Sequence, residues 1–443
     1  MTSWRSAIFV LCAALALAAA GCSGGSSPET SSGATDGVAR IADDDIEAGG
    51  GDDDTAADDA ADDDPADDDS GDDDSGNDDD SAADDDVSFD DFEGWIVGAF
   101  YLPDRNTEAL VLHFRNGVWE TPDLPALGTS SILYGVYALD TANVFAVGSE
   151  LSGSQRAAVV LHWDGNAWTK QTLPPPVSTH SELRTVRFLN EGYGWAGGWT
   201  WGSLTAQLLA LRFIGDHWEH VGSLPLGAGA WANKIAVVDD EKVYFGGTGA
   251  MGGGDSALFY YDHGAWSFVP ALTGAYFTYV AALYFDGPND GYAINCTSRG
   301  GYYGGLGWHS DGAGWTLSGL IFPQSECATD IAATPSGQWH ASGLRMEFSG
   351  KEYPVLKTKN GWLWTNDRLP SLAGRQAEIE ALNFPADDVG IAVGRGWEIP
   401  TGQITGLALR HDGTKWAVVP EISWRPGESF EGVSFLAPDP ADR

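Results

Sequence analysis

The sequence predicts an all-β fold, a seven-bladed β-propeller made of four-stranded antiparallel blades. A tryptophan follows a hairpin turn seven times, and successive copies are 48 to 52 residues apart. Each interval also holds short apolar runs separated by turn residues. A period of about 40 to 50 residues with four strands per unit is typical of a propeller blade. The repeated tryptophans are Trp119, Trp168, Trp218, Trp266, Trp315, Trp364 and Trp416.

The repeat is clearest in residues 183–221, which contain the four runs LRTVRFL, YGWAGGW, AQLLALRF and HWEHV. The last two runs flank Gly215-Asp216, a pair that suits the positive φ angles of a tight hairpin. Apolar residues alternate within the runs, so each sheet buries both faces against neighbouring blades. We expect the first, innermost strands of blades two to seven at residues 132–139, 183–189, 232–238, 278–285, 327–333 and 378–384.

The first blade is predicted to combine the two ends of the chain. Residues 94–100 (GWIVGAF) match a second strand with no first strand before it, and residues 430–436 (FEGVSFL) supply that strand. This C-terminal strand would pair with the N-terminal strands two to four, which closes the ring and removes open sheet edges. Both chain ends then leave from the face that carries the loops between first and second strands, the bottom face. The opposite, top face carries the loops between second and third strands.

Residues 1–21 are interpreted as a lipoprotein signal peptide. Arg5 precedes an apolar run, residues 7–20, which is too short to span a bilayer permanently. The ending Ala-Ala-Gly-Cys resembles the lipobox of bacterial lipoproteins, although Ala19 stands where leucine is usual. The resemblance implies a lipid on Cys22 and, because Ser23 follows, export to the outer membrane, at the cell surface or facing the periplasm. The alternative is an ordinary signal peptide with an incidental cysteine.

Residues 22–92 are predicted to be a disordered, Asp-rich tether, followed by the propeller at 93–443. Residues 22–93 hold 26 Asp and 3 Glu against a single Arg, a net charge of −28. A segment with this charge and so few apolar residues cannot offset the entropy of ordering. Calcium binding is the alternative, although the DDD runs lack the fixed turn glycine of calcium loops. A formal charge of −41 for the whole chain argues against a nucleic-acid partner.

Two further patterns carry a family resemblance. Gly-Gly pairs in second strands (Gly197-Gly198, Gly246-Gly247) and Leu-Pro after the hairpin tryptophan, as in Leu173-Pro174, look like kelch-type repeats. The composite FAVG…LHWDGNAW is similar to repeats of exported bacterial propellers. The resemblance covers residues 94–436 and departs from kelch because most blades lack the full double glycine. It implies a seven-bladed propeller and no particular activity.

Two cysteines remain once the signal peptide is removed and Cys22 is acylated. Cys296 ends a second strand and Cys327 begins the first strand of the next blade, so both lie towards the top face of adjacent blades. We expect a disulfide between them, because an exported protein permits one and the geometry is compatible. Two buried thiols are the alternative.

Several residues that invite a catalytic or metal-binding interpretation are assigned structural roles. The HxDGxxW turns resemble the Asp-box hairpins of sialidases, which are themselves structural, so Asp164, Asp311 and Asp412 are interpreted as turn residues. The third-strand histidines occur one per blade and cannot converge on one metal ion, so we expect half-exposed sheet residues. These are His113, His162, His309 and His411.

Arginines and aromatic residues in the predicted top-face loops suggest a binding site. Arginine's planar group suits carboxylates, sulfates and phosphates, and exposed aromatic rings on loops suit sugar or protein ligands. Ion pairs with nearby acidic loop residues and packing of the rings are the alternatives. The candidate ligand-binding residues are Arg105, Arg156, Arg299, Arg345, Arg395, Trp199, Trp201, Tyr302, Tyr303 and Trp397.

Together these features predict a monomeric, membrane-anchored propeller lipoprotein that binds a protein or an anionic glycan through its top face without catalysis. The alternative is a glycoside hydrolase or lyase acting on a polysaccharide, which needs carboxylates converging at the axis. The sequence does not place Asp330, Glu347 or Glu398 in such a pair, and it contains no nucleophile motif or phosphate-binding loop. No catalytic residue, metal site or cofactor is therefore predicted, apart from calcium on the tether.

Overall fold

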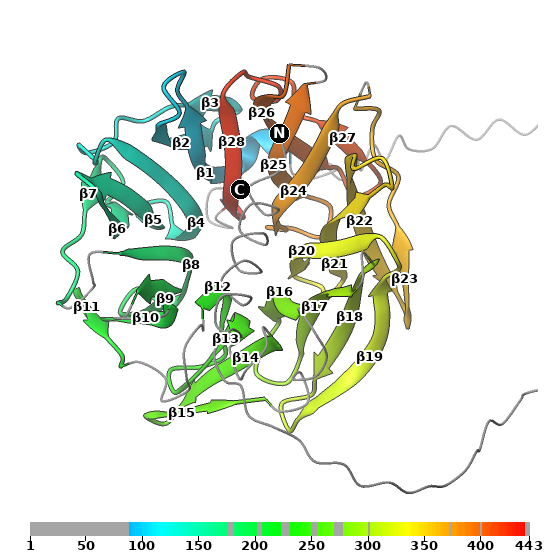
Figure 1. The fold of residues 1–443 in the computed structure, drawn as a ribbon, viewed down its shortest axis with the longest axis horizontal. Helices are drawn as coiled ribbons and strands as arrows, with labels where there is room; N and C mark the ends of the chain where they lie inside the picture. Colours follow the sequence, from blue (N-terminus) through cyan, green and yellow to red (C-terminus); the bar gives the residue numbers. More distant parts are fainter. Residues whose placement is uncertain are drawn as a thin grey trace, which may run out of the picture. The chain divides into compact units, whose positions relative to one another are not determined.

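Seven four-stranded antiparallel sheets surround a central axis, and this confirms the predicted fold (Figure 1). The structure is a computed structural model that describes residues 88–175, 180–201, 206–222, 231–249, 255–269, 278–299, 302–372, 374–398 and 401–438. In each blade the first strand lies nearest the axis and the fourth strand lies at the rim. The predicted first strands all form, within a few residues of the expected bounds.

The strands of each blade follow one another from axis to rim. They are β28 (Glu428–Leu436), β1 (Glu93–Tyr101), β2 (Thr107–Arg115) and β3 (Val118–Glu120); β4 (Ser130–Asp140), β5 (Asn143–Ser152), β6 (Gln155–Trp163) and β7 (Trp168–Lys170); β8 (Ser181–Asn190), β9 (Tyr193–Trp201), β10 (Ala206–Ile214) and β11 (His217–His220); β12 (Trp231–Val237), β13 (Lys242–Gly249), β14 (Asp255–Asp262) and β15 (Ala265–Phe268); β16 (Thr278–Phe285), β17 (Gly291–Arg299), β18 (Tyr302–Ser310) and β19 (Trp315–Phe322); β20 (Glu326–Ala333), β21 (Trp339–Met346), β22 (Glu352–Asn360) and β23 (Leu363–Asn366); β24 (Gln376–Asn383), β25 (Gly390–Glu398), β26 (Gln403–His411) and β27 (Trp416–Val418).

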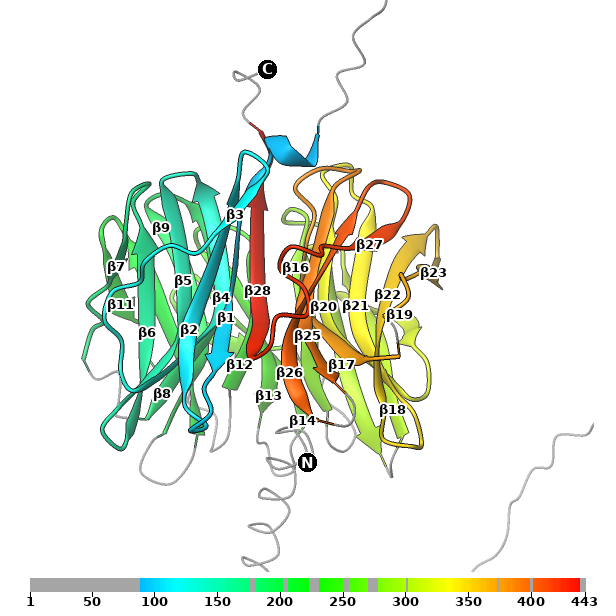
Figure 2. The ribbon, with the colours of Figure 1, turned by 90° about the horizontal axis from the view of Figure 1, so that it is seen from above.

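The first blade joins the two ends of the chain, as predicted. β28 pairs antiparallel with β1, so that Val97 lies opposite Gly432. A short 3-10 helix, η1 (Phe89–Asp91), precedes β1, and the ring of Phe89 lies 5.8 Å from that of Phe435 near the end of β28. Both described ends therefore leave the propeller at the same, bottom face (Figure 2).

The hydrophobic core is divided among the interfaces between blades. Between blades 2 and 3, Phe145 and Val147 pack with Leu183 and Phe188, and the centroids of the two phenylalanine rings are 4.1 Å apart. Stacked aromatic rings of this kind bury a large apolar area. The repeated tryptophans belong to the same interfaces: Trp168, Trp218 and Trp416 are buried, and Trp119, Trp266, Trp315 and Trp364 are half-buried.

A β-bulge interrupts the first strand of every blade at the same position. In β8, Leu183 lies opposite Gly198 and Thr185 opposite Gly197, so Arg184 has no backbone partner in β9. The glycine is needed because a Cβ on Gly198 would lie 1.9 Å from the carbonyl oxygen of Glu182. The recurring second-strand glycine therefore marks the bulge, where the first-strand backbone presses on the second strand. The bulge residues are Glu431, Tyr134, Arg184, Asn233, Ala281, Thr329 and Glu380.

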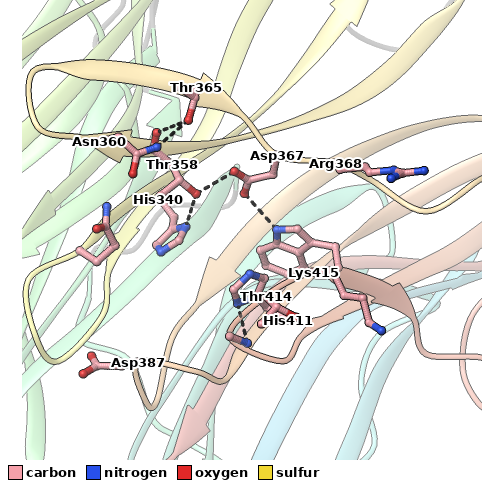
Figure 3. A pocket seen from close by; sticks show the side chains of 13 residues that line it. His340, Thr358, Asn360, Thr365, Asp367, Arg368, Asp387, His411, Thr414 and Lys415 are labelled. Carbon is pink, nitrogen blue, oxygen red and sulfur yellow. Dashed lines mark hydrogen bonds between the residues drawn. The ribbon is translucent and has the colours of Figure 1, made fainter. Parts of the chain in front are cut away.

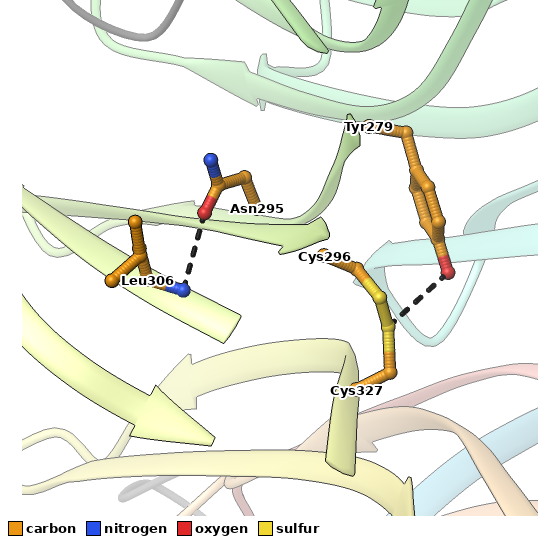
Figure 4. Close-up of a disulfide and its surroundings, with 5 residues drawn as sticks. All are labelled: Tyr279, Asn295, Cys296, Leu306 and Cys327. Carbon is orange, nitrogen blue, oxygen red and sulfur yellow. Dashed lines mark hydrogen bonds between the residues drawn. A yellow bond between two sulfur atoms is a disulfide. The ribbon is translucent and has the colours of Figure 1, made fainter. Parts of the chain in front are cut away.

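A disulfide joins blades 5 and 6 (Figure 4). It links Cys296 of β17 with Cys327 of β20, whose Cα atoms are 5.4 Å apart. The hydroxyl of Tyr279 lies 3.8 Å from the Cys327 Sγ. Both cysteines are buried in the interface core, so the covalent link reinforces the packing of these two blades.

The turn aspartates and third-strand histidines have mostly the expected structural roles. Asp164 Oδ1 accepts backbone N–H bonds from Asn166 and Ala167, and Asp311 and Asp412 do the same in their own turns. His162, His309 and His411 are half-exposed or close to it. The expectation of half exposure is wrong for His113, which is buried because Trp95 stacks on its ring and Glu93 bonds its Nε2 at 2.7 Å.

Some predictions fall on residues that the structure does not describe. Cys22 and the acidic segment up to residue 87 lie outside the described residues, as do the side chains of Arg299, Tyr302 and Tyr303. In the part of the chain that is described, no helix has the length and apolar character needed to cross a membrane.

Candidate functional site

Charged side chains gather on the innermost strands of four adjacent blades, numbers 7, 1, 2 and 3. The bulge residues of these blades are Glu380, Glu431, Tyr134 and Arg184. A bulge re-aims the side chain of the extra residue, because that residue is released from the ladder of hydrogen bonds. We call these residues and their partners the axial cluster, which consists of Tyr101, Tyr134, Arg156, Glu182, Arg184, Glu378, Glu380, Arg395 and Glu431.

Glu182 is the first of two centres in the axial cluster. Its side chain is 3% exposed and accepts hydrogen bonds from five other side chains. The donors are Arg184 (2.6 Å), Arg156 (3.1 Å), Tyr134 (3.2 Å), Ser149 (3.3 Å) and the indole of Trp199 (3.3 Å). These donors offset the cost of burying an ionised carboxylate. Because its acceptor positions are filled, Glu182 orients its partners rather than contacting a ligand.

Arg395 is the second centre, where three carboxylates from β24 and β28 meet one guanidinium. Its Nε donates to Glu378 at 2.6 Å, and the two Nη atoms reach Glu380 at 3.3 Å and Glu431 at 3.5 Å. Glu378 is 3% exposed, whereas Glu380 and Glu431 are each 11% exposed. The last two carboxylates are therefore held more loosely and are the more accessible to a ligand.

The surroundings of Glu431 favour its protonated form. Burial raises the pKa of this carboxyl; the Arg395 guanidinium opposes the rise, and the Glu380 carboxylate adds to it. Three carboxylates share one guanidinium, so a proton on Glu431 relieves the excess of negative charge. Glu431 therefore keeps its proton to a higher pH than an exposed glutamate does.

The two centres form one continuous group. The guanidinium of Arg184 lies 4.3 Å from the ring centroid of Tyr134, which is a cation–π contact. Burial raises the pKa of Tyr134, and the charges of Glu182 and Glu431 add to the rise, so this phenol stays a neutral donor. Side chains of blades 7, 1, 2 and 3 are thus coupled electrostatically around the axis.

A separate ion pair links blades 4 and 6. Lys234 Nζ of β12 lies 2.8 Å from Asp330 Oδ1 of β20, and Asp330 Oδ2 accepts the backbone N–H of Leu382 in blade 7 at 3.0 Å. Asp330 therefore ties three blades together and is not half of a catalytic pair. Glu347 and Glu398 do not form such a pair either; Glu347 bonds to Ser349, and Glu398 bonds to Thr401.

Aromatic rings border the axial cluster at its top end. Trp199 and Trp201 are in a T-shaped contact with centroids 6.4 Å apart, and Trp201 is 52% exposed. The Arg395 guanidinium lies 5.8 Å from the Trp397 ring. Trp424, in the connection before β28, has a φ of +66°, which is rare for a bulky residue and marks a strained position. The top end therefore combines accessible aromatic surface with charged groups.

The predicted arginines fall into two groups. Arg105 lies in the β1–β2 loop and Arg345 near the end of β21, and both are exposed. Arg156 and Arg395 are instead bound to carboxylates of the axial cluster. Arg395 lies inside β25 rather than in a loop, because the loop between the second and third strands of this blade begins only after Glu398.

The glutamates at the centre of the axial cluster were missed from the sequence. Glu182, Glu378, Glu380 and Glu431 all belong to first strands, whose residues were expected to serve packing alone. A signal was present, since each is a glutamate in or next to a predicted first strand, and that strand faces a second-strand glycine. Among the described residues, no group of three or more His, Cys, Asp or Glu side chains is arranged to hold a metal ion.

Comparisons with known proteins find only distant structural similarity. No protein-family model matches the chain, and no curated protein matches it. Among solved structures, a puromycin-hydrolyzing peptidase from Mycobacterium tuberculosis is 13% identical with a TM-score of 0.49, covering 75% of this chain and 51% of its own. The GH74 xyloglucanase from Xanthomonas campestris is 16% identical with a TM-score of 0.44, covering 66% and 46%.

The β-propeller domain of the trilobed protease from Pyrococcus furiosus is 11% identical with a TM-score of 0.44, covering 73% of this chain and 91% of its own. The chain thus spans about half the length of the xyloglucanase and of the peptidase. Similar structures also include a polysaccharide lyase and a family-43 glycoside hydrolase. At these identities and TM-scores the similarity carries no argument about this chain.

Proposed function

We propose that the top face of this propeller, around blades 7, 1, 2 and 3, binds a polysaccharide. The observation that carries the proposal is the arrangement of Trp199 and Trp201 beside the axial cluster. Aromatic rings suit the apolar faces of sugar rings, and partly exposed Arg and Glu side chains suit their hydroxyl groups. Arg156 and Arg395 already pair with carboxylates, so a neutral or weakly charged glycan fits better than a strongly anionic one.

The binding proposal is tested by affinity electrophoresis of the purified protein in gels that contain individual neutral or acidic polysaccharides. The double variant W199A/W201A should lose retardation, because it removes the exposed aromatic surface. W362A is the matched control: Trp362 is 83% exposed but lies in the β22–β23 turn, at the rim. Equal retardation of the wild type and the double variant in every gel would contradict the proposal.

A lipid on Cys22 would hold the propeller at a membrane with its top face outward. The support is the signal-like residues 1–21, the lipobox-like ending and the exit of the described N-terminal end from the bottom face. Partition of the full-length protein into a detergent phase, and its loss in C22A, is the test. Recovery of the wild type in the aqueous phase alone would argue against the lipid.

Catalysis on the bound polysaccharide is a second candidate, favoured by Glu380 and Glu431. These two carboxyl groups share Arg395, and the pKa of Glu431 is raised, so Glu431 keeps its proton to a higher pH. A protonated carboxyl beside an ionised one is the arrangement of a glycosidase acid and its partner. Release of new reducing ends by the wild type, lost in E431Q while gel retardation persists, would identify an enzyme. Retardation without any release would leave binding as the function.

A further inference from the structure

A cavity of about 370 Å³ lies between blades 6 and 7, away from the axial cluster (Figure 3). It is lined by side chains of β21 and β22 in one blade and by the β26–β27 turn in the next. The turn residues Gly413 and Asp387, on the bottom-face side, complete its wall. This volume falls within the range of about 300–1,000 Å³ that is typical of small-molecule sites.

His340 occupies a position that holds a Phe, Tyr or Trp in blades 1 to 5 and Ile391 in blade 7. It lies three residues before the bulge glycine Gly343, as Phe145 lies three residues before Gly148. It also keeps the stacking: its ring lies 4.1 Å from that of Phe384 in the next blade, as Phe145 lies 4.1 Å from Phe188. The imidazole therefore preserves the packing while it adds two polar nitrogens to the interface.

A chain of hydrogen bonds fixes the tautomer of His340. Asp367 accepts from the Trp416 indole at 3.0 Å and from the Thr358 hydroxyl at 2.7 Å. Thr358 has only one proton and gives it to Asp367, so its oxygen accepts from His340 Nδ1 at 3.0 Å. Burial lowers the pKa of His340 to about 4, so the ring is neutral and Nε2 carries a lone pair. His340, a buried residue in the lining of the cavity, thus offers Nε2 as an acceptor.

The hydrogen bond of His411 fixes the opposite tautomer. Its Nδ1 accepts the backbone N–H of Gly413 at 3.2 Å, and burial lowers its pKa, so the neutral ring carries its proton on Nε2. The centroids of the His340 and His411 rings are 6.1 Å apart. One small molecule can therefore meet a fixed acceptor and a fixed donor at the same time.

The two imidazoles in the lining of the cavity are neutral. Asp367 is occupied by two donors, and the cationic ends of Arg368 and Lys415 extend away from the two imidazoles (Figure 3). The lone pair of His340 disfavours an anion, and the N–H of His411 disfavours a cation. A hydroxyl group both donates and accepts, so a pair of neighbouring hydroxyls complements the two rings.

We propose that this cavity is a second ligand site and that it takes a neutral polyhydroxylated molecule of the size of one sugar residue. The source is either a free sugar or the terminal residue of a glycan. This inference rests on blades 6 and 7 and is independent of the binding proposed for the top face.

The test is long-range ¹H–¹⁵N spectroscopy of the imidazoles in the full-length, ¹⁵N-labelled protein. Glucose, galactose and mannose, each followed by a disaccharide ending in the same sugar, are titrated one at a time. At least one should shift the Nε2 signals of His340 and His411 together and saturably. Equal affinity for a sugar and its disaccharide indicates a free sugar, and tighter binding of the disaccharide indicates a glycan end.

Variants decide whether the cavity is responsible. H340F keeps the stacked ring, as Phe145 does in blade 2, but removes the acceptor, so binding should weaken at least about tenfold. T358V removes the partner that fixes the tautomer and should also weaken binding. H162F, a matched change in blade 2, should bind as the wild type does. Absence of any saturable shift, or wild-type affinity in both H340F and T358V, would overturn the proposal.

Discussion

Replacing Arg395 with methionine tests whether charge holds the axial cluster together. Methionine keeps an unbranched stem but leaves Glu378, Glu380 and Glu431 without their common partner. Arg395 is 19% exposed and the three carboxylates are 3–11% exposed, so the lost pairs are largely buried. Removing one partner of a buried ion pair costs about 3–5 kcal/mol. Over roughly 350 residues, an unfolding entropy of about 2.1 cal/mol/K per residue converts this cost into a Tm lower by about 4–7 °C.

The assay is thermal unfolding followed by circular dichroism at neutral and acidic pH. Without Arg395 the three carboxyl groups repel one another, so their pKa values in the folded state rise above those in the unfolded chain. Because the folded state then binds protons more tightly than the unfolded state, protonation favours folding at pH values below the unfolded-state pKa. This contribution is lost as the pH rises through the folded-state pKa. The Tm deficit of R395M should therefore shrink as the pH falls below about 5.

R156M is the matched control for this experiment. Arg156 is 36% exposed, and its partner Glu182 keeps a second guanidinium, that of Arg184. Its loss should cost less than about 1 kcal/mol. If R395M were no less stable than R156M, or if its deficit did not shrink in acid, the idea that Arg395 neutralises the cluster would be wrong.

Three further changes probe the framework around the sites. Gly394→Ala should lower the Tm by about 1–4 °C, because its Cβ would lie 2.0 Å from the Glu378 carbonyl oxygen and overpacking costs about 1–3 kcal/mol. Gly314→Ala, whose Cβ would meet nothing within 4 Å, should leave the Tm unchanged. Loss of the Cys296–Cys327 disulfide, as C296A/C327A, should cost about 3–4 kcal/mol from the chain entropy of a loop with sequence separation 31; equal denaturant midpoints for variant and wild type would contradict this. Because the pKa of His340 falls from its usual 6.5 to about 4, stability should decrease as the pH falls from 6.5 towards 4, and H340F should show a shallower decrease over the same interval in calorimetry.

The fold was predictable because the repeat period is visible in the sequence without knowledge of any contact between residues. Seven hairpin tryptophans gave the blade count, and an unmatched second strand near Val97 gave the closing partner near Val433. The turn dipeptides located the third and fourth strands because Gly, Asn and Asp favour the required backbone angles there, although His263 takes a φ of +48° in the β14–β15 turn. Each of these signals lies in a short stretch of sequence, and the tryptophan and the turn dipeptide recur once in each blade.

The site was less predictable because it depends on small offsets within a strand. Arg395 was expected in a loop, yet three residues of β25 follow it before that loop begins. Glu380 and Glu431 reach it only because a bulge shifts each of them out of register. Alternation of apolar residues predicts which face a side chain takes in a regular strand, and a bulge breaks that rule. His340 was missed for a different reason: its position resembles a packing position and differs only in chemistry.

In the first strand, different residues pack against the neighbouring blade and make contacts near the axis, because of the bulge. Residues on either side of it, such as Leu183 and Val186, pack against the neighbouring blade, whereas the bulge residue Arg184 makes its contacts near the axis with Glu182 and Tyr134. A substitution of Arg184 therefore changes the contacts near the axis, whereas the bulge residue Ala281 of blade 5 belongs to a core cluster. Ala281 in blade 5 and Glu431 in blade 1 occupy equivalent positions in equally regular sheets, which shows that the scaffold accepts both a methyl group and a carboxylate there. The asymmetry of charge around the axis therefore depends on which residue each blade places at its bulge, together with neighbouring first-strand residues such as Glu182 and Glu378.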